Sequence, residues 1–235
     1  MSETLGTLPM NEVTTGNARE LIKGLPDGSI DLILTDPIYS NLDDYYWLYT
    51  ECRRLLKPNG NVLAFVNAKW YAVVSRIVMS DLPPLACVQT SGASPMNGRI
   101  IAKTYYLLWF GSGKLKGYMP DGYIGTSWSA ANKHNFKWTK NPKYLKTTLA
   151  AFTEPFDVVL DMFCGGGSIL AACKEMERNY IGVEMDQDTA EKARALLNSV
   201  NVLPLAAANT ASSRLFEGWG ELPAVANQSE SDLPA

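Results

Sequence analysis

The segment from Asp157 to Glu184 constrains the fold of this chain most strongly. Asp157–Met162 is a short apolar run typical of a buried strand, and Ser168–Met176 has the spacing of a helix. A second apolar run, Tyr180–Glu184, follows at once. A strand, a helix and a second strand in this order indicate two parallel strands joined by a crossover helix.

The rest of the chain repeats this alternation of strand and helix, which predicts an α/β fold with a doubly wound, mostly parallel sheet. We expect Leu85–Thr90 and Thr104–Phe110 to form an antiparallel edge hairpin. The other expected strands are Ile30–Thr35 and Asn61–Val66, and the other expected helices are Asp43–Leu56, Lys69–Met79, Pro142–Phe152 and Gln187–Val200.

The expected domain organisation is a single domain with two appendages. Residues 13–200 form the domain, and a chain of 235 residues is long enough for one α/β core. Residues 1–12 are an N-terminal arm, about 91–141 a loop-rich insert, and 201–235 a mostly disordered tail rich in Ala, Ser, Pro and acids.

Composition excludes several classes of protein. No apolar run approaches the roughly 18–20 residues that span a bilayer, and the polar, acidic start of the chain does not resemble a signal peptide. We therefore expect a soluble, cytoplasmic protein with no membrane partner. Four widely separated cysteines and a single histidine, His134, argue against a metal site.

Positive charge is concentrated in one stretch although the net charge is −3. Between Arg99 and Lys146 nine basic residues stand against one acid, Asp121, and aromatic residues are interleaved with them. This pattern favours a polyanionic partner, although any single lysine is also compatible with a solvated surface. The residues that we expect to contact this partner are Lys103, Lys114, Lys116, Trp128, Lys133 and Lys137.

A glycine-rich loop connects the first strand of the Asp157–Glu184 unit to its helix. Gly165 and Gly167 let the backbone approach a ligand closely, and the helix that starts at Ser168 offers free N–H groups. Glu184, which ends the next strand, can accept hydrogen bonds from both hydroxyls of a ribose. The loop therefore predicts a nucleoside-containing cofactor; the alternative is a tight turn beside a solvated acid. Leu170 replaces the third glycine of the dinucleotide fingerprint, which disfavours NAD.

The tetrapeptide Asp36-Pro37-Ile38-Tyr39 ends the expected strand Ile30–Thr35. The Asp36 carboxylate and the Pro37 carbonyl are acceptors, and Tyr39 offers a flat face for stacking. Two acceptors beside an aromatic ring suit an amino group on a flat base, although a plain turn with a packed Tyr39 is the alternative. Asp36 and Asp161 are 125 residues apart, yet both follow expected parallel strands, so we expect one crevice to hold both motifs.

Together these motifs resemble the amino-methyltransferases of DNA, the adenine-N6 and cytosine-N4 enzymes. Asp36-Pro37-Ile38-Tyr39 matches their Asp-Pro-Pro-Tyr signature, and Asp161 to Gly167 matches their Asp-x-Phe-x-Gly-x-Gly loop. The catalytic tetrapeptide precedes the cofactor loop, as in the circularly permuted beta class. The resemblance implies that S-adenosyl-L-methionine is the cofactor and double-stranded DNA the partner, with Asp36, Pro37 and Tyr39 as catalytic residues and Asn17, Asp161, Phe163, Gly165, Gly167, Ser168 and Glu184 as cofactor contacts.

An acid in the first position of the tetrapeptide is commoner in the adenine enzymes, so the resemblance favours methylation of adenine N6. Two features depart from the family pattern: Ile38 replaces the second proline, and Asn141 separates Lys140 from Pro142 where the family often has Lys-Pro. A cytosine-N4 or RNA methyltransferase, a DNA-binding relative impaired by Ile38, and an NAD-dependent dehydrogenase stay open as alternatives. The sequence also leaves open a homodimer, a companion restriction endonuclease and the DNA sequence recognised.

Overall fold

The computed structural model describes residues 3–38, 41–78, 82, 84–89, 94–96, 100–102, 104–117, 123–126 and 140–201. Its helices are α1 Ala18–Leu21, α2 Leu42–Leu55, α3 Ala68–Val78, α4 Pro142–Phe152, α5 Ser168–Glu175 and α6 Gln187–Ser199, with a 3₁₀ turn η1 at Ile22–Gly24. Its strands are β1 Thr4–Leu5, β2 Leu8–Pro9, β3 Glu12–Thr15, β4 Ile30–Thr35, β5 Leu56–Asn67, β6 Leu85–Gln89, β7 Ser94–Met96, β8 Ile100–Ala102, β9 Thr104–Gly111, β10 Tyr123–Thr126, β11 Val158–Asp161 and β12 Asn179–Glu184.

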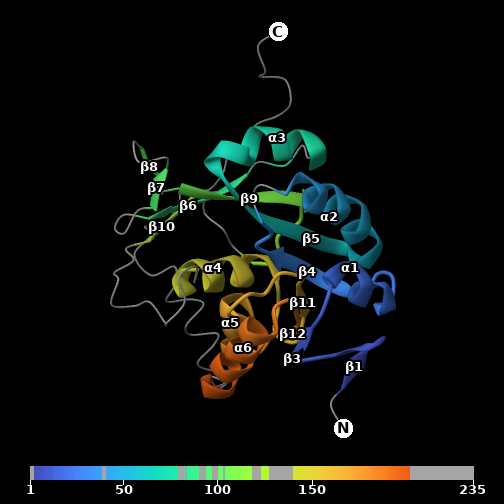
Figure 1. The fold of residues 1–235 in the computed structure, drawn as a ribbon. Helices are drawn as coiled ribbons and strands as arrows, with labels where there is room; N and C mark the ends of the chain where they lie inside the picture. The colour runs from blue at the N-terminus through green and yellow to red at the C-terminus, as the bar shows by residue number, and fades with distance from the viewer. Residues whose placement is uncertain are drawn as a thin grey trace.

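An eight-stranded sheet forms the centre of the molecule, with the spatial order β10-β6-β9-β5-β4-β11-β12-β3 (Figure 1). Every neighbouring pair is parallel except the two pairs made by β9, which is antiparallel to both β5 and β6. Helices cover both faces, α1, α2 and α3 on one and α4, α5 and α6 on the other (Figure 1). The predicted α/β class with a mostly parallel sheet is confirmed.

Strand β4 shows how the two faces are built. Its six residues, Ile-Asp-Leu-Ile-Leu-Thr, are all buried. Leu32 and Leu34 point to the face covered by α4, α5 and α6, whereas Ile33 packs on the opposite face against α2 and α3. Burial of each such side chain contributes about 1.5–3 kcal/mol, and because both faces are apolar the strand cannot slip its register without exposing one set.

The order of the strands reverses between β4 and β11. From β4 the chain passes through α2 to β5 on one side, and from β11 it passes through α5 to β12 on the other side. The loops that follow β4 and β11 therefore diverge and leave space between them at the carboxyl ends of the strands. In open α/β sheets this is the position where ligands bind.

Several elements differ from the sequence expectations. Strand β3 pairs with β12 and extends the sheet at its edge, and β10 lies outside β6, so the antiparallel pair of β6 and β9 is one strand in from the edge. Residues 56–60, which precede the expected strand Asn61–Val66, already belong to β5. The predicted tail lies outside the described residues from 202 onward, and no helix within the described part of the chain is long and apolar enough to span a membrane.

Candidate functional site

The ends of β4 and β11 are joined by a buried hydrogen bond. The Thr35 hydroxyl, one residue before Asp36, donates to Oδ1 of Asp161 over 2.8 Å. Asp161 is only 1% exposed, and its second oxygen, Oδ2, has no hydrogen-bond partner among the residues that the structure describes. The tetrapeptide and the glycine loop thus lie side by side, as the sequence analysis expected.

Burial raises the pKa of Asp161 to about 7. Hydrogen bonds from Thr35 and from the Phe163 backbone N–H act in the opposite direction, and the nearby charges of Asp36 and Glu184 raise the pKa further. The carboxyl groups of Asp36, Asp161 and Glu184, at the carboxyl ends of β4, β11 and β12, are therefore close enough to influence one another. A cation that approached Oδ2 of Asp161 would favour its ionised form.

The glycine loop has the backbone conformation that its sequence predicts. Gly165 (φ +50°) and Gly167 (φ +80°) both adopt left-handed conformations that side chains disfavour. A Cβ at Gly165 would meet no atom within 4 Å, so the space before the loop is open, whereas a Cβ at Gly167 would lie 3.0 Å from Cβ of Ala193 on α6. Gly165 keeps the ligand side clear, and Gly167 lets α6 pack closely behind the start of α5 at Ser168.

Glu184 lies beside the same loop. Its Oε2 accepts the Gly165 backbone N–H and its Oε1 accepts the Asp186 backbone N–H, each over 2.9 Å. Each carboxylate oxygen can accept a second hydrogen bond, so Glu184 retains capacity for the hydroxyls of a ribose. The Glu184 carbonyl accepts the Gly16 N–H, which brings Asn17 next to the loop; the Asn17 side chain itself caps α1 by accepting the Arg19 N–H.

Lys140 contacts Asp36, and the sequence analysis did not include it among the candidate residues. Its Nζ lies 2.6 Å from Oδ2 of Asp36, and it also lies 4.5 Å from the centroid of the Phe65 ring. Oδ1 of Asp36 is buried and, within the described residues, has no hydrogen-bond partner. The sequence signal for Lys140 was its place near Pro142, with Asn141 between them, and that signal does not identify Asp36 as the partner.

A second cluster connects α1 and α2 to the glycine loop. The Phe163 ring packs edge-on against Trp47, with ring centroids 6.2 Å apart, and the guanidinium of Arg19 lies 5.2 Å from the Trp47 ring. Arg19 also pairs with the mostly buried Asp44 over 2.9 Å, and Asp44 accepts the Asn41 side-chain amide. The cluster anchors the first turn of α2, directly after the segment that carries Asp36.

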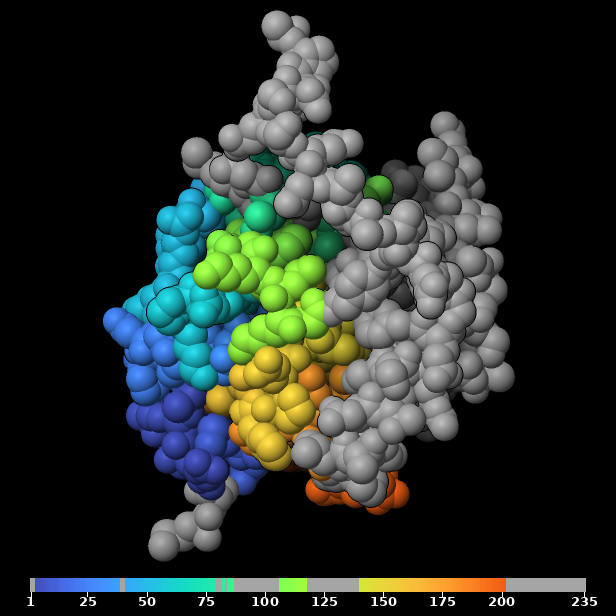
Figure 2. Space-filling view, turned by 180° about the vertical axis from the view of Figure 1, so that it is seen from behind, coloured from blue at the N-terminus to red at the C-terminus, as the bar shows by residue number. Residues whose placement is uncertain are grey.

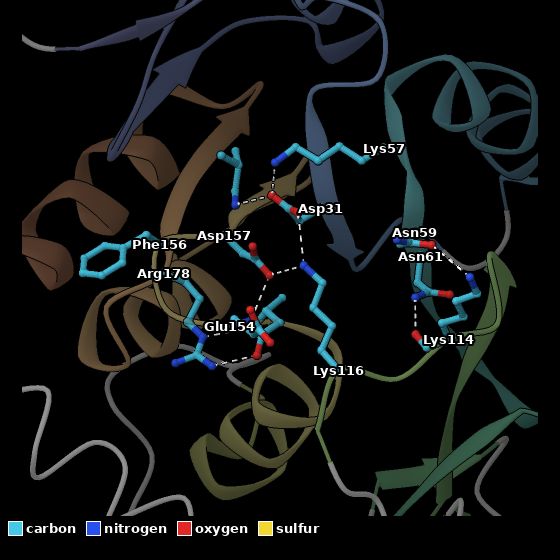
Figure 3. Close-up of polar contacts among 12 residues, drawn as sticks. Asp31, Lys57, Asn59, Asn61, Lys114, Lys116, Glu154, Phe156, Asp157 and Arg178 are labelled. Atoms are coloured by element: carbon cyan, nitrogen blue, oxygen red, sulfur yellow. Dashed lines mark hydrogen bonds and ion pairs between the residues drawn. The ribbon is translucent and has the colours of Figure 1, made fainter.

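Lys114 and Lys116 lie at the amino ends of the parallel strands, away from the carboxyl ends that carry Asp36 and the glycine loop (Figure 3). Nζ of Lys116 lies 3.2 Å from Asp31, the second residue of β4, and 2.5 Å from Asp157, just before β11. Nζ of Lys114 donates to Asn59 over 3.2 Å. The structure thus does not bring these two lysines together with Asp36 and the glycine loop.

Figure 2 shows the segment 106–117 lying against α4 on the surface, where the backbone N–H groups of Lys116 and Gly117 donate to the Ala151 carbonyl.

Cys52, Cys164 and Cys173 are buried free thiols, and burial raises the pKa of each. Within the described residues no group of three His, Cys, Asp or Glu side chains could hold a metal ion. Outside the described residues lie Tyr39, Lys103, Trp128, Lys133 and Lys137.

Comparison with known proteins gives a consistent family. Residues 30–195 match the family model N6_N4_Mtase, which is described as DNA methylase. The type II methyltransferase M.HpaI of Haemophilus parainfluenzae is 26% identical over an alignment that covers 78% of this chain and 73% of that protein. The type II methyltransferase M.BglII of Bacillus subtilis is 22% identical over 80% of this chain and 69% of its own length.

Solved structures share the fold. The M1.HpyAVI–SAM complex superposes with a TM-score of 0.66 at 24% identity and covers 80% of this chain and 98% of its own. The PvuII DNA methyltransferase, named as cytosine-N4-specific, has a TM-score of 0.68 at 17% identity and covers 88% of this chain and 92% of its own. At these identities the superpositions establish the arrangement of the sheet and helices.

Proposed function

Because the chain belongs to the N6_N4_Mtase family of DNA methylases, we propose that it transfers a methyl group from S-adenosyl-L-methionine to the N6 amino group of adenine in double-stranded DNA. One observation carries this proposal: the Thr35–Asp161 hydrogen bond of 2.8 Å joins the strand end that bears the tetrapeptide to the strand end that bears the glycine loop. A methyl acceptor bound at the tetrapeptide and a methyl donor bound at the glycine loop would therefore be neighbours.

The residues at the glycine loop fit S-adenosyl-L-methionine. The unpartnered Oδ2 of Asp161 suits the α-ammonium group of the methionine moiety. Glu184 has acceptor capacity for the ribose hydroxyls, and the open space before Gly165 admits the ligand close to the backbone. Asn17, Phe163, Gly167 and Ser168 complete the cofactor contacts that we propose. The donor supplies a methyl group activated by attachment to a sulfonium.

The residues of the tetrapeptide bind and orient the amino group that receives the methyl. The lone pair of adenine N6 is delocalised into the ring, so the amino group is a poor nucleophile. Hydrogen bonds from this group to the Asp36 carboxylate and the Pro37 carbonyl localise the lone pair as the C–N bond rotates. Positioning and preorganised charge then supply most of the rate. The base leaves the duplex at a cost of a few kcal/mol, and stacking on Tyr39 returns about 1–3 kcal/mol.

Cytosine N4 is the second candidate acceptor, because the cytosine-N4-specific PvuII enzyme shares the fold with a TM-score of 0.68. Adenine is preferred because an acid, Asp36, occupies the first position of the tetrapeptide, as it more often does in the adenine enzymes. Both amino groups present a similar hydrogen-bonding pattern to Asp36 and Pro37, so only the product distinguishes them.

Methylation of unmodified DNA tests the proposal. The purified full chain is incubated with S-adenosyl-L-methionine and genomic DNA from a host that lacks methyltransferases, and the DNA is digested to nucleosides for mass spectrometry. We expect N6-methyladenine, and we expect Asp36→Ala to form none above background while it still binds S-adenosylhomocysteine.

The other products decide between the alternatives. N4-methylcytosine alone would replace adenine by cytosine as the target and would leave the methyltransferase assignment intact. DNA binding without any methylated base would support a DNA-binding relative without catalysis. Binding of NAD with no binding of S-adenosyl-L-methionine would overturn the proposal.

A further inference from the structure

The two oxygens of the Asp36 carboxylate have different surroundings. Oδ2 lies 2.6 Å from Nζ of Lys140. Oδ1 is buried and has no hydrogen-bond partner within the part of the chain that the structure describes. A buried carboxylate oxygen without a donor is unfavourable unless a ligand supplies one. Oδ1 is therefore the oxygen that is available to a bound group, and Oδ2 is already engaged.

Lys140 is held in place from two sides. Its ammonium lies 4.5 Å from the centroid of the Phe65 ring, and its side chain is only 14% exposed. Phe65 is buried in β5, which pairs with the β4 strand that leads to Asp36. The residue after Lys140, Asn141, caps α4 by accepting the Lys143 N–H over 2.9 Å. A cation over an aromatic face with a fixed backbone has little freedom to leave its partner.

This arrangement restricts which groups can bind at Oδ1. A second cation there would be repelled by the ammonium of Lys140, which lies against the other oxygen of the same carboxylate. A neutral amino group donates a hydrogen bond without that repulsion, and the exocyclic amine of a nucleobase is such a group. The surroundings of Asp161 are different. Its Oδ2 is unpartnered among the described residues, and the charged groups that raise its pKa are the carboxylates of Asp36 and Glu184.

We propose that Lys140 is a positioning residue that fixes Oδ2 of Asp36 so that Oδ1 accepts a hydrogen from the amino group of the target base. The inference rests on the proposed function. In the transfer step the nitrogen–carbon bond forms as the sulfur–carbon bond breaks, and the electron pair of the broken bond stays on sulfur. The surplus hydrogen on nitrogen leaves as a proton to Oδ1. Lys140 exchanges no proton and acts through its charge and its position.

A different role for Lys140 would have a different signature. If its ammonium bound the carboxylate of the methyl donor instead, removal of the side chain would weaken donor binding. If it only stabilised the fold near α4, no added cation would restore activity. A positioning role predicts a loss in the methyl-transfer rate with donor affinity unchanged, and partial recovery when a small ammonium ion fills the space that the side chain vacates.

The experiment compares Lys140→Ala with wild type and with Lys143→Ala, which removes an exposed lysine from the first turn of the same helix. Single-turnover methyl transfer is measured on DNA that the wild type methylates, and the affinity for S-adenosylhomocysteine is measured by calorimetry. We expect Lys140→Ala to be about 10- to 100-fold slower with affinity within about twofold. Ethylammonium should restore part of the rate, and tetramethylammonium at equal ionic strength should not, because it has no N–H to donate.

Each remaining outcome has a defined meaning. A wild-type rate in Lys140→Ala, or parallel losses of rate and donor affinity, would overturn the positioning role. If Lys140→Ala does not fold, Lys140→Met retains the contact over Phe65 without the charge and should show the same slow transfer; a wild-type rate in Lys140→Met would also overturn the role. A wild-type protein that methylates no DNA would instead refute the proposed function, before any variant is compared.

Discussion

We expect the charge state of Asp161 to govern the pH dependence of donor binding. Burial raises its pKa to about 7, and an α-ammonium group at Oδ2 would favour the ionised form. Below pH 7 a proton must therefore leave before the donor binds. We expect the affinity for S-adenosylhomocysteine to rise as the pH increases from about 5.5 to 7.5, with a slope approaching about tenfold per pH unit at the acidic end. Calorimetry across this range measures the slope.

Asp161→Asn is the matched variant, because it retains the size of the side chain and cannot ionise. Its affinity should be lower than that of wild type at pH 7.5 and nearly independent of pH. Without ligand, the free energy of unfolding should depend on pH in the wild type. Because folding raises the pKa of the Asp161 carboxyl, the wild-type protein loses stability as the pH rises through about 7, and Asp161→Asn does not show that loss. An identical pH slope in Asp161→Asn would assign the dependence to another group.

Ile38 is the one departure within the tetrapeptide, and its side chain is 66% exposed. Because it contributes little packing, we expect Ile38→Pro to be tolerated and to raise the unfolding free energy by about 0.4–1 kcal/mol through restriction of the unfolded chain. The methylation rate should stay within severalfold of wild type, measured alongside thermal unfolding. A gain of 100-fold or more would indicate that Ile38 impairs the natural enzyme.

At the scale of the elements, four side chains tie the amino ends of β4 and β11 together. Asp31 pairs with Lys57 over 2.6 Å and with Lys116 over 3.2 Å, and Lys116 also pairs with Asp157 (Figure 3). Burial raises the pKa of Asp31, but hydrogen bonds from Lys57 and the Val158 N–H and the charges of both lysines outweigh burial and hold the pKa below its usual value. The stability that this carboxylate contributes is therefore present above its ordinary pKa and is lost as the pH falls through the lowered one.

Lys116→Met should therefore reduce stability and leave methylation unchanged. Two carboxylates lose a partner, and because Lys116 is partly exposed we expect a loss of about 1–2 kcal/mol in urea unfolding at pH 7, less than for a fully buried pair. The matched control is Lys114→Met, because Nζ of Lys114 donates to the neutral Asn59 side-chain oxygen and not to a carboxylate. Equal losses in the two variants would contradict the role of the ion pairs.

Elements with a clear apolar pattern and marked ends were predictable from sequence, whereas β3 and β10 were not. The predicted helix 142–152 and the predicted strand 30–35 agree with α4 and β4 to the residue, because capping at Asn141 and a bounded apolar run mark their ends. Strand β3 has only four residues, Glu-Val-Thr-Thr, and is held by pairing with β12, which no local pattern reveals. Pairing outside the local sequence also explains why β10 was not expected.

The candidate site divides in the same way. The sequence predicted that the segments ending in Asp36 and Asp161 lie close together although they are 125 residues apart. This prediction follows from the general rule that ligands bind at the carboxyl ends of parallel strands where the strand order reverses. The Lys140–Asp36 ion pair depends instead on where α4 packs relative to β4 and β5, which is a tertiary property. For the same reason the sequence analysis grouped Lys116 with the lysines expected to contact DNA, although its neighbours are Asp31 and Asp157.

At the scale of the whole molecule, the chain carries a net charge of −3, so it cannot attract DNA through its overall charge. A duplex that delivers a base to Asp36 must approach the carboxyl ends of the parallel strands. Lys114 and Lys116 lie at the opposite ends of these strands, the amino ends. The phosphate contacts must therefore come from other basic residues, and we propose Lys103, Lys133 and Lys137, with Trp128 as a stacking residue, for this role.

The salt dependence of DNA binding tests this division of the lysines. Each phosphate that a protein neutralises contributes about −0.9 to the slope of log K against log salt concentration. We expect the pair Lys133→Ala and Lys137→Ala to make the slope shallower by about 1.8, because two phosphate contacts are lost, and to weaken binding on every DNA sequence alike. Fluorescence anisotropy between about 50 and 200 mM salt covers the range over which such contacts weaken most. The pair Lys114→Ala and Lys116→Met removes the same number of charges from the amino ends of the strands and should leave the slope unchanged. If this pair alone made the slope shallower, the duplex would have to contact the amino ends of the strands. Asp36 could then not be the residue that receives the base.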